Sequence, residues 1–476
     1  MKKKTLKRFA AIGMCTVLMG SMLAGCGNKE SNGADDGEIT LVFAQDLDVN
    51  EKANNVVNEI LSEYTESTGV NIQFESLPSS DYRTWLTTQF SADSGPDVYS
   101  GLIYDMVPDY QKGYLYNFAD LYEEESKYDT GAKWGDLLPE YIKERMYISD
   151  TEVPGYPTAT SVVRIFCNKD IFEKAGAEIP TTWEEFMDSC EKIKAYGVTP
   201  FAFPNATIND LSWLWFGNSL CGQLDSGIVE VLDESGNGYV ELNEICKGMD
   251  EGNIDFNDPQ LIAAFDLMKD FSQYWTSDYN GLSQQQATEM FARGEAAMVQ
   301  VMSIAMEGID SIIGDSFEYV VVPVPTVTEE TNKDALGKSV ILGGQPDIIY
   351  GVNKALEADE EKLNAAIDFV QYMSSSDVQA RLAEELGRVP LSTNVELPEK
   401  LEGFRITEEP LRMPFFTGIN NKLRNYYQRS GQEFLSGKIT TKEFADTMNK
   451  AYEEVLDEIK AENGWSADNN YGITEQ

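Results

Sequence analysis

Histidine is absent from all 476 residues of this chain. Histidine is the usual general base of Ser-His-Asp and Cys-His catalysis, and it is the commonest protein ligand of transition metals. Its absence excludes those catalytic classes and every histidine-ligated metal site. Catalysis by paired carboxylates stays open, because the chain holds 80 Asp and Glu residues.

Cysteine is scarce, and its spacing is irregular. No two cysteines form a CxxC pair, which a thiolate zinc site would need, so the sequence predicts no zinc site. Whether any of the last four form a disulfide is left open. The six positions are Cys15, Cys26, Cys167, Cys190, Cys221 and Cys246.

Basic residues are also few. The chain has 37 Lys and Arg against 80 Asp and Glu, which gives a formal net charge of −43 at pH 7. So acidic a chain repels phosphate groups, and this charge argues against nucleic acid and anionic lipid as partners. The hydrophobic fraction of 42% predicts a packed globular protein, and the length predicts two domains.

Long apolar runs are missing except near the start. Phe9 to Leu23 carries no charge, follows five basic residues, and is too short to span a bilayer easily. It ends in Leu23-Ala24-Gly25-Cys26, which resembles a lipobox. We therefore expect a lipoprotein signal peptide over residues 1–25, a lipid anchor at Cys26 and a flexible tether over 26–37. The protein would lie on the extracellular face of the cell membrane. A plain signal peptide with a chance cysteine is the alternative.

The most informative stretch that is present runs from Val153 to Phe203. Pro154 to Pro157 breaks regular structure before a predicted strand, Ser161 to Cys167. Two predicted helices follow, Lys169–Lys174 and Thr182–Tyr196, and a glycine ends each of them. We interpret the stretch as a crossing from one folding unit to another.

Strands and helices alternate before this crossing. Predicted strands at 38–43 and 70–74 alternate with predicted helices at 53–64 and 82–90. The alternation indicates an open, largely parallel sheet with helices on both faces. Ligands of such sheets bind at the carboxyl ends of the strands. This places four candidate ligand residues: Gln45 and Asp46, for which a solvated loop is the alternative, and Tyr104 and Asp105.

Several motifs stand in an order that resembles a known family, the extracellular solute-binding proteins of ABC importers. The resemblance is to the large carbohydrate-binding group that includes maltose-binding proteins. Besides the lipobox, the motifs are Gly95-Pro96-Asp97-Val98, Asn168-Lys169-Asp170, Pro180 to Phe186, Phe291 to Met298 and Gly387 to Pro390.

The resemblance implies an α/β, two-lobed periplasmic-binding-protein-like fold of type II, with discontinuous lobes joined by hinge crossovers. The N-terminal lobe would comprise residues 38–156 and 325–373, and the C-terminal lobe residues 157–324 and 374–476. The implied crossings lie near Gly155–Thr158, Val322–Pro325 and Met373–Ser375.

The resemblance also implies partners. A monomer would bind a sugar or oligosaccharide between its lobes and deliver it to ABC permease subunits in the membrane, with no cofactor required. The chain departs from the family pattern at Cys167, where a tyrosine is usual. It also lacks the Gly and Trp that often occur in the strand at Val299–Ile304.

Sugar binding needs aromatic faces for the rings and polar groups for the hydroxyls. Family position favours Asp210 and Trp213 as ligand residues, with Trp215 behind them. Because the two tryptophans are two residues apart, they cannot share one helix face, and a position of both in the core is the alternative. Further candidates are Gln300 and Ser303, which follow Met298, and Arg424 and Tyr427, for which a packed helix surface is the alternative.

One motif stands apart from the family pattern. The segment Asp233 to Glu244 fits the spacing of a calcium loop, with Gly238 at the sharp turn. The alternative is a β-hairpin between strands at 229–232 and 239–242. The predicted ligands are the carbonyl of Tyr239 and the side chains of Asp233, Ser235, Asn237, Glu241 and Glu244.

The sequence therefore favours a binding protein over an enzyme. A secreted carbohydrate-active enzyme with paired carboxylates is the main alternative, but no carboxylate pair stands out in the sequence. A structural adhesin is a third class and would bind no small ligand. The sequence does not name the sugar.

Overall fold

A computed structural model describes residues 39–47, 51–224, 227–236, 238–408, 411–415 and 420–473 of the chain. The expected signal peptide, the lipid anchor Cys26 and the tether lie outside the described residues, as does Asn237 of the predicted calcium loop.

Three parallel strands open the fold, as the alternating pattern predicts. β1 (Thr40–Asp46) lies between β2 (Asn71–Leu77) and β3 (Val98–Gly101), and both pairings are parallel. The antiparallel strand β8 (Gly343–Val352) pairs with β3. The connecting helices are α1 (Glu51–Thr68), α2 (Ser79–Ser91) and α3 (Ile103–Gln111).

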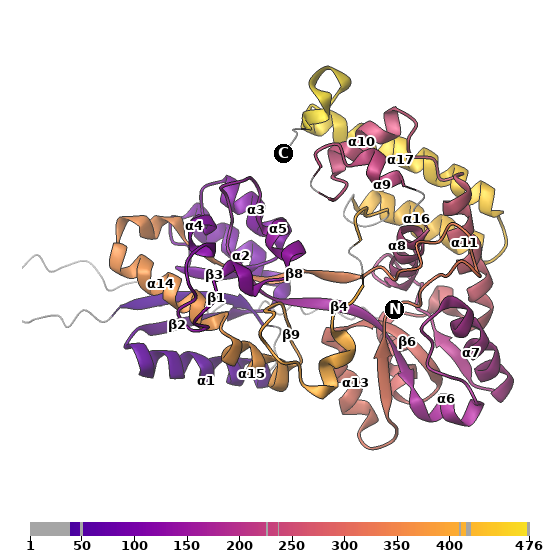
Figure 1. Cartoon of the computed structure of the whole chain (residues 1–476), viewed down its shortest axis with the longest axis horizontal. Coiled ribbons are helices and arrows are strands. Elements are labelled where there is room, and N and C mark those ends of the chain that lie inside the picture. Colours follow the sequence, from indigo (N-terminus) through magenta and orange to yellow (C-terminus); the bar gives the residue numbers. More distant parts are fainter. Residues whose placement is uncertain are drawn as a thin grey trace, which may run out of the picture. The chain divides into compact units, whose positions relative to one another are not determined.

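The long strand β4 (Tyr156–Asn168) joins two groups of strands. Its first half pairs with β8 and with β9 (Val389–Pro390), and its second half pairs with β6 (Ala296–Met302) and β7 (Tyr319–Val322). β5 (Thr199–Ala202) extends the second group by pairing parallel to β6. Figure 1 shows β4 running from β8 toward β6 and α6.

The predicted first crossing lies at the start of β4. A Cβ atom on Gly155 would come within 2.5 Å of the carbonyl oxygen of Tyr350, so the close approach of β8 requires glycine there. The pairing of β4 with β8 also changes register between Pro157 and Val162. Such irregularities bend a strand locally.

The apolar side chains form separate clusters. One cluster contains Phe43, Trp134 and Phe369, with members from residues 41–156 and 349–391. A second contains Trp183 and members up to residue 471. A third, smaller cluster lies within residues 162–404.

The segment between the predicted second crossing and β8 packs with the second cluster. Val324, Val327 and Leu342 all belong to that cluster, whereas Ile349 belongs to the first. The predicted lobe ranges stay predictions, and this packing favours moving the second boundary from residue 325 to β8.

The helices after β4 begin and end where their local chemistry predicts. Asn168 caps α6 (Lys169–Ala175), and Thr182 and Glu185 form a capping box at the start of α7 (Trp183–Tyr196). Gly176 and Gly197 end these helices with φ values of 65° and 95°, a region that favours glycine.

The β-hairpin interpretation of residues 229–242 is wrong. Val229 and Leu232 are buried on one face of a short helix, α9 (Ile228–Leu232), and α10 (Leu242–Asp250) follows the loop. The other helices are α4 (Ala119–Tyr122), α5 (Glu140–Met146), α8 (Ser212–Gln223), α11 (Pro259–Phe271), α12 (Gln284–Ala292), α13 (Met306–Ile313), α14 (Glu360–Met373), α15 (Ser376–Leu386), α16 (Asn421–Leu435) and α17 (Thr441–Asn463).

Candidate functional site

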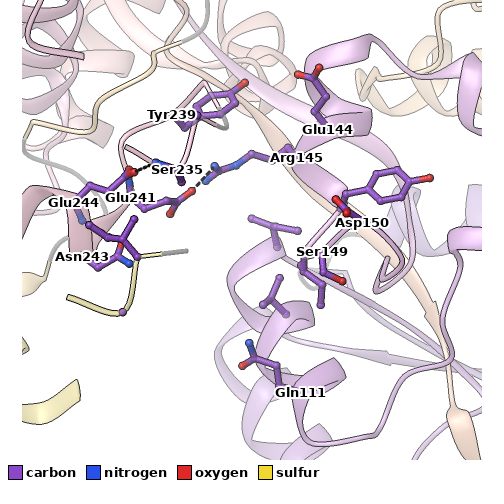
Figure 2. A pocket seen from close by; sticks show the side chains of 17 residues that line it. Gln111, Glu144, Arg145, Ser149, Asp150, Ser235, Tyr239, Glu241, Asn243 and Glu244 are labelled. Atoms are coloured by element: carbon purple, nitrogen blue, oxygen red, sulfur yellow. Dashed lines mark hydrogen bonds and ion pairs between the residues drawn. The ribbon is translucent and has the colours of Figure 1, made fainter. Parts of the chain in front are cut away.

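A pocket of about 890 Å³ lies beside α3 and α5. Its walls come from α3, from residues 144–150 at the end of α5 and beyond, from the segment 235–244, and from Gly472 and Ile473. Figure 2 shows charged and hydroxyl side chains around it. The carboxylates in the lining belong to Glu144, Asp150, Glu241 and Glu244, against one guanidinium, that of Arg145.

Arg145 connects three parts of this region. Its Nε donates a hydrogen bond to Oε1 of Gln345 on β8 at 3.1 Å. Its Nη1 lies 3.7 Å from Oε1 of Glu241, and its guanidinium lies 5.1 Å from the ring centre of Tyr239. Nothing in the sequence marks Arg145 as a site residue, because no motif covers α5 and an arginine in the last turn of a helix is common.

Tyr104, a predicted ligand residue, presents an exposed aromatic ring on α3. Its side chain is 68% exposed, which is unusual for so large a ring. Partial burial, and after it the negative charge of Asp347, raise the pKa of Tyr104. In the sequence, Tyr104 comes directly after Ile103, and Ile103 lines the pocket.

The other predicted residues of the first sheet lie at the carboxyl ends of strands or just after them. Gln45 is buried, and its Oε1 has no hydrogen-bond partner among the described residues. Oδ1 of Asp46 accepts a hydrogen bond from Ser100 at 3.5 Å. Oδ1 of Asp105 lies 3.3 Å from Nε of Arg83, so an ion pair already engages that carboxylate.

Gln284, at the start of α12, connects Asp210 with Gln300 through hydrogen bonds. Oδ1 of Asp210 accepts a hydrogen bond from the amide of Gln284 at 2.6 Å, and Nε2 of Gln284 donates to the carbonyl of Gln300 at 3.0 Å. Both side-chain amide atoms of Gln300 are buried and have no partner within the described chain. Oγ of Ser303 accepts a hydrogen bond from the amide of Val162 at 3.3 Å.

The sequence analysis missed Gln284, although a signal for its position exists. Ser283 and Gln286 form a capping box at the start of α12, and this S-x-x-Q pattern places Gln284 at the first helical position.

Trp213 and Tyr427 require a correction. Both are fully buried, and their rings stack with centroids 4.9 Å apart. The indole N–H of Trp213 donates to the carbonyl of Tyr427, and the Tyr427 hydroxyl donates to the carbonyl of Trp213. Neither ring leaves a face for a sugar, so the two residues form a core pair. Arg424 donates to the carbonyl of Ile208 at 2.7 Å.

The predicted ligand residues therefore do not form one site in the structure; they lie in separate groups. None of the ten predicted ligand residues belongs to the lining of the pocket, whereas four of the predicted calcium ligands do: Ser235, Tyr239, Glu241 and Glu244.

The four cysteines beyond Cys26 are buried free thiols. Burial raises the pKa of Cys190 and Cys167 far above that of an exposed thiol. In the described ranges, no three His, Cys, Asp or Glu side chains group together in a way that would hold a metal ion. None of the helices within those ranges has both the length and the apolar surface that crossing a membrane requires.

Comparison with known proteins identifies a family. Residues 59–410 match the family described as bacterial extracellular solute-binding protein, which is well over half of the chain.

Curated relatives match at low identity. A multiple sugar-binding protein of Streptococcus mutans is 26% identical over 204 residues, which is 41% of this chain and 44% of that protein. The sn-glycerol-3-phosphate-binding periplasmic protein UgpB of Brucella melitensis is 23% identical over 253 residues, 51% of this chain and 50% of that protein. The chain spans about half the length of these relatives. Their names are those of binding proteins.

Solved structures share the fold. A probable secreted solute-binding lipoprotein from Streptomyces coelicolor superimposes with a TM-score of 0.66 at 17% identity, covering 88% of this chain and 100% of that chain. The likeness confirms the predicted fold class, a two-lobed α/β fold of type II with discontinuous lobes joined by crossovers.

Proposed function

We propose, from the premise that this chain belongs to the bacterial extracellular solute-binding proteins, that it captures a sugar or oligosaccharide between its two lobes and delivers it to the permease of an ABC importer. Such a protein binds and releases its ligand unchanged. The ligand favours the closed arrangement of the lobes only in so far as it binds that arrangement more tightly.

The observation that carries this proposal is the pocket whose walls come from α3, from the end of α5 and from the segment 235–244. Its volume of about 890 Å³ lies within the range of about 300–1,000 Å³ that ligand pockets occupy. The exposed ring of Tyr104 offers a flat apolar face, and the polar lining offers donors and acceptors for hydroxyl groups. Ligand contacts by Gln45, Asp46, Asp105, Asp210, Gln300, Ser303 and Arg424 stay predictions.

The charge of the pocket favours a neutral polyol over an anion. One of the relatives is named for binding sn-glycerol 3-phosphate, and Arg145 could pair with a phosphate. However, the lining holds four carboxylates around that one guanidinium, and the chain carries a net charge of −43. A phosphate group would be repelled, so an uncharged sugar is the better ligand.

The proposed location is the outer face of the cell membrane. The sequence from Phe9 to Cys26 supports a lipid anchor at Cys26, although that segment lies outside the described residues. An anchor there, followed by the tether over 26–37, would keep a monomeric binding protein close to its permease.

A thermal-shift screen tests this function. The purified chain is heated with neutral monosaccharides and oligosaccharides and, separately, with glycerol 3-phosphate. We expect a neutral sugar to raise the melting temperature, because a ligand that binds only the folded state stabilises it. Chromatography of the recovered sugar should show no cleavage products.

Two variants locate the binding. Tyr104→Ala should abolish the sugar-induced shift, whereas Tyr196→Ala, which removes an exposed tyrosine at the end of α7, should leave it unchanged. A larger shift with glycerol 3-phosphate would overturn the choice of ligand. Cleaved sugar would favour the carbohydrate-active enzyme, and no shift with any solute would favour the adhesin.

A further inference from the structure

The loop between α9 and α10 has features that sugar capture does not explain. It runs from Asp233 to Glu244 and connects two helices, the arrangement in which helix–loop–helix calcium sites occur. Its residues Ser235, Tyr239 and Glu244 also line the pocket (Figure 2).

Asp233 lies at the first position of the loop, and one of its carboxylate oxygens contacts the backbone of the loop. Oδ2 accepts a hydrogen bond from the amide of Gly238, the sixth position, at 3.0 Å. This bond holds the carboxylate across the inside of the turn. Oδ1 is buried and has no hydrogen-bond partner among the described residues, and the side chain is only 9% exposed. An unpaired buried carboxylate oxygen is costly unless a ligand satisfies it.

The third position repeats this situation, and the twelfth carries a buried carboxylate whose oxygens accept only backbone amides. Oγ of Ser235 is also buried without a partner in the described part of the chain. Glu244 is 2% exposed, and its two oxygens accept the amides of Ser235 and Glu241, each at 2.7 Å. No described basic side chain forms an ion pair with Glu244, so its buried negative charge lacks a cation.

We propose that this loop binds one calcium ion. Oδ1 of Asp233, Oγ of Ser235, the carbonyl of Tyr239 and the carboxylate of Glu244 would ligate it, with Glu241 acting through a water molecule. All are hard oxygen ligands, the type that Ca²⁺ prefers, and they stand at positions 1, 3, 7, 12 and 9 of the loop. Asn237, at position 5, lies outside the described residues.

Arg412 and the hydrogen bonds of Glu244 limit which oxygens can ligate the ion. Arg412 lies 3.4 Å from Oδ2 of Asp233 and donates to the carbonyl of Gly238, so its charge rests on the oxygen that already accepts the Gly238 amide and not on Oδ1. The ion would also draw the Glu244 carboxylate away from the amides that it now accepts. The site therefore needs a hydroxyl, a carbonyl and a rotated carboxylate, not three carboxylates already grouped together.

Terbium luminescence tests the site in the full-length chain. Tb³⁺ takes the same oxygen ligands as Ca²⁺ and emits when a tyrosine beside it is excited. We expect sensitised emission from the EDTA-treated protein, its loss on adding Ca²⁺ but not equal Mg²⁺, and a saturable heat of Ca²⁺ binding with one site. Tyr239→Phe should remove most of the emission and keep the heat, because only the carbonyl of this residue ligates the ion.

Variants separate a built site from binding to the acidic surface. Asp233→Asn and Glu244→Gln should each weaken Ca²⁺ binding at least about tenfold. Glu234→Gln, which removes an equal charge from an exposed, non-ligating position of the same loop, should not. A melting curve in EDTA shows which variants fold, and Asp233→Asn leaves the Glu244 hydrogen bonds intact. The proposal is overturned if the native chain binds no Ca²⁺ at millimolar concentration, or if all three variants bind it as the native chain does.

Discussion

Arg145 owes its importance to its position rather than to the strength of any one contact. Its carboxylate partner Glu241 is about half exposed, and pairs of this kind typically contribute about 0–1 kcal/mol. The side chain nevertheless contacts Gln345, Glu241 and the ring of Tyr239, which come from different segments of the chain. It therefore connects the end of α5 with β8 and with the segment 239–241 at one wall of the pocket.

The stacked pair of Trp213 and Tyr427 gives a prediction about stability. Trp213→Ala should lower the free energy of unfolding by about 3–5 kcal/mol, because it leaves a cavity in the core and removes the indole that stacks on Tyr427 and donates to its carbonyl. Denaturant unfolding followed by circular dichroism measures this loss.

Trp215→Ala is the matched control. The side chain of Trp215 is only partly buried, so its removal should cost clearly less than that of Trp213. A Trp213→Ala variant with native stability but no sugar binding would contradict the core assignment.

Sequence reasoning identified this aromatic cluster but not its orientation. Two tryptophans two residues apart on a helix must face different ways, which the sequence shows. Which of them faces the core depends on α16, whose Tyr427 lies more than 200 residues further along the chain. Local sequence carries no information about that contact.

At the scale of elements, α7 is a helix whose first residue is determined by contacts between residues close in sequence. Oγ1 of Thr182 accepts from the amide of Glu185 at 3.3 Å, and the Glu185 carboxylate accepts from the amide of Thr182 at 3.2 Å. Both bonds lie within four residues, so the start of the helix could be predicted. The helix α9 could not, because the run Ile228–Leu232 is short and mostly apolar, and such a run fits a buried strand as well as a helix.

The capping box of α7 should contribute measurably to the free energy of unfolding. Thr182→Ala should lower the free energy of unfolding by about 1 kcal/mol, since the amide of Glu185 loses its acceptor. Thr182→Ser keeps a hydroxyl at the same place and should lose much less. Equal losses for the two variants, measured by urea denaturation, would show that the methyl group and not the hydroxyl stabilises α7.

At the scale of the whole molecule, the class of fold could be predicted and the exact crossings could not. Alternating strands and helices indicate a parallel sheet wherever pairing partners follow each other closely, as β1 and β2 do. The pairing of β4 with β8 joins residues about 190 positions apart, and it makes β8 the place where the apolar packing changes cluster. The pocket also depends on contacts between residues far apart in sequence, because its walls come from residues 103–150, 235–244 and 472–473.

The central claim is that this protein binds a neutral sugar and releases it unchanged. Calorimetric titration tests it most directly, with the sugar that raises the melting temperature most and with recovery of that sugar afterwards. We predict a saturable heat with one site per chain, a dissociation constant on the order of micromolar, which corresponds to about −8 kcal/mol, and intact sugar at the end. A titration without heat for every neutral sugar tried, or recovery of cleaved sugar, would contradict the account.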